Sequence, residues 1–220
     1  MPRPPTNDYH DLGGGLYEWS AYDRASRVDL YTHALRAGDR LVLFDPIPLR
    51  KERFDEILAA VGNLPAGPIL LTNGNHARKA AQFRKFLKNT TVVLAAAEAR
   101  AALREDDLEI DGELVGNGGN APPLPDGLQP VPLPGFAPGE TAFFHPENGG
   151  TFIVGDALIN LPPYDFAPLP EKYCADPKTA RRSLRCLLDF SFARLVFAHG
   201  DPLLENARGR LEALLSALQP

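Results

Sequence analysis

The segment from Ile69 to Ala81, ILLTNGNHARKAA, constrains the fold of this chain more than any other. Its first three residues are apolar, as in a buried strand, and at Thr72 they give way to polar residues and a glycine. Apolar residues then recur at helical spacing, at Ala80, Phe83, Phe86 and Leu87. This pattern predicts a strand, a turn and a helix in direct succession, which is typical of an α/β sheet.

The turn of this unit is the first place to look for a ligand-binding site, because ligands of open α/β sheets gather at the carboxyl ends of strands. Its candidate residues are Asn73, Gly74, Asn75, His76 and Arg78. Together with Lys79, the histidine and arginine form a positive cluster that would suit a phosphate or carboxylate at a helix N-terminus. The alternative is a solvated polar turn that caps the helix, with the asparagines serving the turn itself.

Composition indicates a soluble globular protein. The chain has 220 residues, of which 44% are hydrophobic and 23% charged, and its 22 prolines and 19 glycines indicate many loops. We expect a single domain over residues 1–220. The net charge of −5 argues against a nucleic-acid or anionic membrane surface as partner.

The expected location is the cytoplasm. The N-terminal sequence MPRPPTNDYH has no apolar core of a signal peptide, and no segment approaches the ~20 apolar residues of a membrane span. Cys174 and Cys186 are the only cysteines, and their spacing matches neither a redox CxxC motif nor a zinc cluster.

Periodicity predicts strands and helices along the whole chain. The expected strands cover residues 16–21, 28–35, 40–44, 69–71, 92–95, 131–133, 140–144, 151–154 and 193–198. The expected helices cover residues 51–61, 80–87, 96–104, 177–188 and 203–218. Residues 116–139 and 161–177 are expected to be long loops, the second of them a lid or a surface wrap.

Three predicted strands end in polar residues suited to ligand binding. One ends in the turn from Asn73 to Arg78, the second in Gly155-Asp156, and the third in His199-Gly200-Asp201. Because carboxyl ends of strands share one edge of a sheet, these residues are expected to converge on one site.

Four segments, taken in order from Arg40 to the C-terminus, resemble the metallo-β-lactamase superfamily. LVLFDP resembles a strand and aspartate of that fold, and ILLTNGNHARKAA resembles its H-x-H-x-D-H loop and helix. PLPGFAPGETAFFHPENGGTFIVGDAL is similar to the P-G-H-T-P-G, hairpin and G-D segment, and LVFAHGD to the last strand and G-H turn. The resemblance implies an α/β fold of the αββα four-layer sandwich type, with two mixed β-sheets face to face and helices on the outer faces.

The chain departs from the family pattern at most metal-binding positions. Asn73 and Asn75 stand at the first two histidines, Ala77 at the aspartate, and Arg78 at the last histidine of the motif. Phe136 stands at the next histidine, where it would either fill the metal space or pack under the loop. The two positions that match the family are Asp156, which bridges two metals in relatives, and His199. His76 occupies a variable position of the motif but is expected near the site.

Ligand chemistry then argues against a dinuclear zinc centre, because an amide is a poor substitute for imidazole or thiolate. We expect no cofactor, or at most one divalent metal ion held by Asp156, His199 and His76. Arg78 would repel an ion, since its guanidinium stays protonated. We therefore hypothesise that Arg78 pairs with Asp156 and replaces the metal.

Three functions remain open. The first is a protein of hydrolase ancestry that lacks the dinuclear site and binds or hydrolyses a small, anionic molecule. The second is a hydrolase of an ester, lactone or phosphoester with one metal ion on Asp156 and His199. The third is a non-catalytic scaffold or interaction protein, and a homo-oligomer is compatible with all three.

Overall fold

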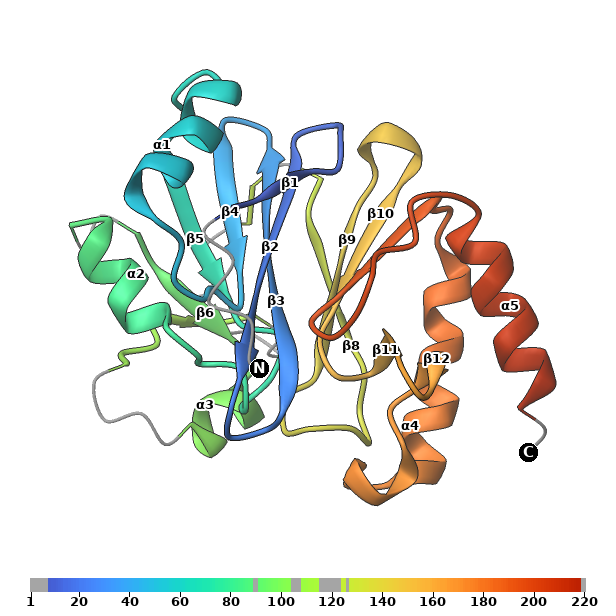
Figure 1. The fold of residues 1–220 in the computed structure, drawn as a ribbon. Helices are drawn as coiled ribbons and strands as arrows, with labels where there is room; N and C mark the ends of the chain where they lie inside the picture. Colours follow the sequence, from blue (N-terminus) through green and yellow to red (C-terminus); the bar gives the residue numbers. More distant parts are fainter. Residues whose placement is uncertain (1–7, 89–90, 104–107, 115–123, 126, 219–220) are drawn as a thin grey trace.

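Two β-sheets pack face to face and carry helices on their outer surfaces, as Figure 1 shows. The structure is a computed structural model that describes residues 8–88, 91–103, 108–114, 124–125 and 127–218. Both sheets contain parallel and antiparallel pairs of strands. The expected αββα arrangement of two mixed sheets is confirmed.

The first sheet has seven strands that lie side by side in the order of the chain. They are β1 (His10–Asp11), β2 (Leu16–Asp23), β3 (Val28–Ala37), β4 (Arg40–Phe44), β5 (Ala66–Leu70), β6 (Val93–Ala95) and β7 (Gly112–Glu113). The strands from β1 to β4 are antiparallel, and those from β4 to β7 are parallel. Parallel neighbours need crossover connections, and three helices supply them: α1 (Lys51–Ala60), α2 (Ala80–Phe86) and α3 (Ala97–Ala102).

The second sheet has four strands in the order β13, β10, β9 and β8. Their bounds are β8 (Gln129–Pro132), β9 (Thr141–His145), β10 (Thr151–Val154) and β13 (Arg194–Phe197). Short 3₁₀ helices cover Glu147–Gly149, Glu171–Tyr173 and Leu184–Asp189. The helices α4 (Pro177–Ser183) and α5 (Ala207–Ala217) lie on the outer face of this sheet, at the right of Figure 1.

The core has three layers, because each sheet is apolar on both faces. Between the sheets, the rings of Phe44 and Phe143 meet at a centroid distance of 5.3 Å. A second cluster lies between the first sheet and its helices, and includes Trp19, Phe54 and Phe83. The third lies under α4 and α5 and includes Phe152 and other aromatic residues of the second sheet. Burial on both faces fixes the sheets and thereby the ends of their strands.

Local sequence patterns predicted the positions of most helices and strands correctly. The Asp176 carboxylate caps α4 by accepting hydrogen bonds from the backbone N–H groups of Lys178 and Thr179, and Pro177 occupies the first helical position. The helix expected from residue 203 begins only at Ala207, because Leu203 exchanges two backbone hydrogen bonds with Leu195.

The loop expected at residues 161–177 was wrong in part. Within it, β12 (Asp165–Pro168) pairs with β11 (Leu158–Leu161) as an antiparallel hairpin. The loop expected at residues 116–139 contains β8, in agreement with the strand predicted at residues 131–133. Its part at 116–123 lies outside the described residues. Arg104, the last residue of the third predicted helix, also lies outside them. Residues 184–189 form a 3₁₀ helix instead of continuing the α-helix. Among the described residues, no helix is long and apolar enough to cross a membrane.

Removing the Phe152 ring should destabilise the second sheet. This ring has no solvent exposure and contacts those of Phe144, Phe190 and Phe192 at centroid distances of 5.2, 5.3 and 4.9 Å. Phe152→Ala is expected to lower the free energy of unfolding by about 3–5 kcal/mol in urea denaturation. Tyr173→Ala, at a ring that is 59% exposed, should change it by less than about 0.5 kcal/mol. Similar effects of the two substitutions would contradict this core.

Candidate functional site

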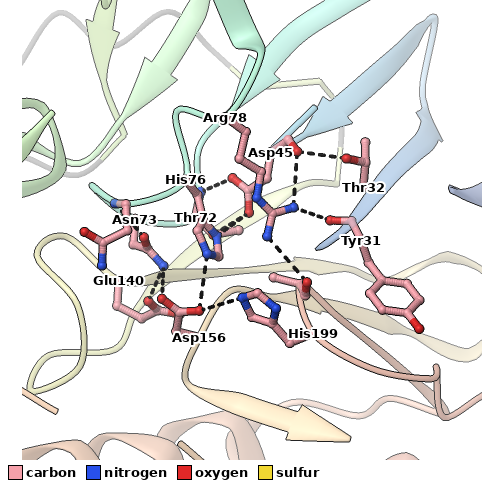
Figure 2. Close-up of polar contacts among 12 residues, drawn as sticks. Tyr31, Thr32, Asp45, Thr72, Asn73, His76, Arg78, Glu140, Asp156 and His199 are labelled. Atoms are coloured by element: carbon pink, nitrogen blue, oxygen red, sulfur yellow. Dashed lines mark hydrogen bonds and ion pairs between the residues drawn. The ribbon is translucent and has the colours of Figure 1, made fainter. Parts of the chain in front are cut away.

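The ends of strands from both sheets meet in a polar cluster, shown in Figure 2. Asp45 follows β4, and Thr72 to Arg78 form the turn after β5. Asp156 follows β10 and His199 follows β13. The three strand ends that the sequence singled out therefore do converge.

Asp156 lies at the centre of this cluster. Its Oδ1 atom is 3.2 Å from Nε2 of His76 and 3.2 Å from Nε2 of His199. The two imidazole rings meet edge to face, with their centroids 5.6 Å apart. Each of the three residues offers one ligand atom, and these atoms lie within 4.8 Å of one another. Two imidazole nitrogens and one carboxylate oxygen thus face a common point.

Asp45 holds the other side of His76. Oδ2 of this buried carboxylate lies 2.9 Å from Nδ1 of His76. The backbone N–H of Thr72 donates to Oδ1 at 2.8 Å, and the Thr72 hydroxyl donates to Oδ2 at 2.5 Å. These bonds fix the orientation of the His76 ring, so that its Nε2 atom points at Asp156.

His76 is charged at neutral pH. Burial disfavours the charged ring, but the negative charges of Asp156 and Asp45 outweigh burial and Arg78, and raise the pKa of His76 to about 9. Its two N–H groups then donate to Asp45 and Asp156. Although burial opposes ionisation of Asp156 too, His76 and His199 hold the pKa of this carboxyl well below its usual value. His76 therefore forms ion pairs with both Asp45 and Asp156.

Glu140 is a second buried acid beside Asp156. Its Oε1 atom accepts a hydrogen bond of 3.0 Å from the backbone N–H of Ala157, and Oε2 accepts one of 2.7 Å from Nδ2 of Asn73. The same Asn73 amide donates to Oδ2 of Asp156 at 3.2 Å. Burial and the charge of Asp156 raise the pKa of Glu140 to about 8. At neutral pH, Asn73 therefore bridges one ionised and one protonated acid.

Arg78 does not take the role expected of it. Its Nη1 group donates to the backbone oxygen of Tyr31 and, at 3.4 Å, to that of Asp45, while Nη2 donates to that of Ala198 at 3.4 Å. Asp156 contacts the two histidines, and no ion pair joins it to Arg78, although both lie in the described part of the chain. The hypothesis of an Arg78–Asp156 pair was wrong, because the guanidinium is directed at backbone carbonyls of both sheets.

Two other predicted site residues lie at the margin of the cluster or outside it. The Asn75 side chain is exposed, and its backbone N–H donates to Oδ1 of Asn73 at 2.8 Å, as in an ordinary polar turn. Phe136 is buried in the hydrophobic cluster under α4 and α5, together with Leu184 and Leu187. The structure thus supports the packing alternative for Phe136.

The sequence did not single out Asp45 and Glu140 as site residues. Asp45 follows an apolar strand directly, which is the signal that also identified Asp156. Glu140 directly follows a glycine and lies immediately before β9, with no comparable signal. Its role becomes visible only when the turn after β5 is placed beside it.

A cavity of about 290 Å³ adjoins the His199 side of the cluster. It is lined by residues of the β2–β3 hairpin, of the end of β11 and of the segments after β11 and β13, among them Tyr22, Arg27, Asn160 and Asp201. The Asp29 backbone oxygen, on its wall, lies 3.3 Å from Nδ1 of His199. A small molecule in this cavity would lie beside Asp29, whose carbonyl contacts His199, and beside Gly200, which follows His199 in the chain.

Replacing Arg78 should destabilise the junction of the two sheets. In Arg78→Lys, one ammonium group replaces a planar fork that bonds three carbonyl oxygens, and unpaired buried carbonyls are costly. We expect the free energy of unfolding to fall by about 1–3 kcal/mol. Arg100→Lys, at a half-exposed side chain, is the matched control and should have little effect. Equal stabilities of the two variants would contradict this role.

The metal-free protein should become less stable as pH rises from about 6.5 to about 9. In the folded protein His76 keeps its proton up to about pH 9, whereas in the unfolded chain it loses the proton near pH 6.5. Its contribution to the free energy of unfolding is therefore full below pH 6.5 and is lost as pH rises through 9. The loss from His76 alone is on the order of 3 kcal/mol. The raised pKa of Glu140 also makes the stability fall as pH rises from the ordinary pKa of a glutamate to about 8.

Urea unfolding in the presence of a chelator measures this slope. His76→Gln should lose most of the part between pH 8 and 9, which lies above the pKa of Glu140. A wild-type stability that is constant over this range would contradict a charged His76.

The architecture is that of solved metallo-β-lactamases, at low sequence identity. The DIM-1 metallo-β-lactamase superimposes with a TM-score of 0.71 at 11% identity, and the match covers 100% of both chains. A metallo-β-lactamase from Erythrobacter litoralis has a TM-score of 0.70 at 16% identity over 96% of each chain. A metallo-β-lactamase family protein from Thermus thermophilus has a TM-score of 0.59 at 22% identity, over 94% of this chain and 80% of the other.

No protein-family model and no curated protein matches the sequence. The likeness is therefore one of structure. Matches over nearly the whole of both chains show that this chain has the fold of the metallo-β-lactamases.

Proposed function

We propose that this protein is a hydrolase that uses a single divalent metal ion, held by His76, Asp156 and His199. The observation that carries this proposal is the convergence of their three ligand atoms within 4.8 Å. Two imidazoles and one carboxylate are a suitable donor set for zinc, manganese or iron.

The surroundings of the three residues also fit a metal site. In protein metal sites, the second polar atom of each ligand is normally held by another group, which fixes the direction of the first. Here Asp45 holds Nδ1 of His76, and the Asp29 carbonyl lies against Nδ1 of His199. Asn73 donates to Oδ2 of Asp156. The atoms that remain are the three that converge.

A second ion has little support among the described residues, where these three form the one group suited to a metal. The family positions that would hold another ion carry Asn73, Asn75 and Arg78 in this chain. Asn73 is already bonded to two acids, Asn75 is exposed, and Arg78 is cationic. We therefore propose that the dinuclear centre is lost and one ion remains.

When bound, the ion would supply a Lewis acid that activates water and polarises the bond to be hydrolysed, as in an ester, lactone or phosphoester. Asp156 is the one carboxylate of the proposed ligand set and would give it its negative charge. Asp45 keeps the His76 ring oriented, and the cavity beside His199 would hold the substrate.

A second candidate function uses the same site without metal. Protonated His76 and the guanidinium of Arg78 place two positive charges in the cluster, which favours a small anionic ligand. Against this, Asp156 already neutralises His76, and the Nη groups of Arg78 are bonded to carbonyl oxygens. Metal analysis distinguishes the two candidates.

The direct test is elemental analysis of protein purified without chelator and supplied with zinc, manganese or iron. We expect about one ion per chain. Asp156→Asn and His199→Ala should abolish this binding, while Asp45→Asn should weaken it roughly 10–100-fold by releasing the His76 ring. Asn75→Ala, at an exposed turn residue, is the control and should bind as wild type.

The same samples should be assayed on panels of esters, lactones and phosphoesters. Hydrolysis should disappear with the ion and return when it is restored. Two ions per chain, no ion, or hydrolysis that survives Asp156→Asn would each contradict the proposed function.

A further inference from the structure

A basic cavity of about 370 Å³ lies in the helical layer over the second sheet, where α4 and the 3₁₀ helix after it meet α5. Its walls carry four cationic side chains and one acidic one, with three apolar residues. They are Lys178, Arg181, Arg182 and Arg185, then Glu171, then Pro177, Leu215 and Leu218. Such a concentration of positive charge contrasts with the chain as a whole, whose net charge is −5.

The four cations form one face of a helix. Lys178, Arg181, Arg182 and Arg185 follow the spacing i, i+3, i+4 and i+7, so they lie along the same side of α4 and the turn after it. Nη2 of Arg185 donates to the Leu215 carbonyl at 3.3 Å, which anchors one end of this face to α5. Arg181 forms an ion pair with Glu171. Lys178 and Arg182 are exposed.

A second cavity of about 150 Å³ adjoins the first. The two share Glu171, Pro177, Arg181 and Leu218 as lining residues. The other residues that line the second cavity are mostly apolar: Phe136, Pro168, Leu169, Pro170, Cys174 and Ala180. A basic cavity therefore adjoins a recess with mostly apolar side chains.

We infer that this pair of cavities binds a soluble amphiphilic anion, with a phosphate or carboxylate head and a short alkyl chain. The head matches Lys178 and Arg182, because guanidinium and ammonium groups form strong charge-assisted bonds with such anions. The chain matches the recess beside Phe136 and Leu169.

A dispersed molecule fits better than a membrane surface. In a helix that binds membranes, apolar side chains project outward to enter the lipid. Here Lys178 and Arg182 of the basic cavity are exposed, whereas Phe136 and Ala180 of the adjoining recess are buried. This inference is independent of the metal-dependent activity, since none of the lining residues belongs to the Asp156 cluster.

Titration calorimetry of the full chain with octyl phosphate below its micelle concentration tests the inference. We expect saturable binding of one molecule per chain. Inorganic phosphate and octanol should each bind about tenfold more weakly or not at all, because each presents half of the ligand.

Charge reversal then locates the site. The double variant Lys178→Glu/Arg182→Glu should weaken octyl phosphate binding by about tenfold or more. Its control is Arg50→Glu/Lys85→Glu, which changes the net charge equally at exposed positions of the opposite helical layer and should bind as wild type. Circular dichroism of both variants verifies that they are folded.

Three results would overturn the inference. They are unchanged binding in the Lys178/Arg182 variant, equal affinity for inorganic and octyl phosphate, and binding to anionic phospholipid vesicles without binding of dispersed octyl phosphate. The last would assign the basic face to a membrane instead.

Discussion

The pairing of His76 with two buried carboxylates is the interaction on which the rest of the site depends. Asp45 and Asp156 lie at the ends of strands in different sheets, and the His76 ring stands between them, 2.9 Å from one and 3.2 Å from the other. Buried carboxylates without a partner would be strongly destabilising. In the metal-free protein, one protonated imidazole thus stabilises both acids and connects the ends of the two sheets, and Arg78 reinforces the same junction through backbone carbonyls.

Sequence periodicity predicted most strands and helices, because it reports which faces are buried, whereas the arrangement of two sheets was implied by the family resemblance. The strand, turn and helix around Asn73 to Arg78 could be read directly, and so could the strand ends at Asp156 and His199. Partners of side chains were harder to predict. Arg78 has a backbone φ of 45°, and this turn directs its guanidinium at carbonyls instead of Asp156. No periodic pattern reveals that conformation in advance.

The family pattern was similarly informative about fold and incomplete about chemistry. It identified Asp156 and His199, but it aligned Asn75 and Phe136 with metal ligands, whereas one is exposed and the other lies in the core. His76, from a variable position, joins the other two instead. The hydrogen bonds that orient it come from Asp45 and Thr72, whose importance depends on a three-dimensional contact between the end of β4 and the turn after β5.

The two hydrogen bonds of the Asn73 amide couple the turn after β5 to the residue before β9. Its one amide nitrogen serves Glu140 and Asp156 together. A histidine at position 73, as in the family motif, would replace this shared donor with a ring and leave the two acids facing each other. A change at position 73 would therefore need a compatible change at position 140, although the two positions lie far apart in the sequence.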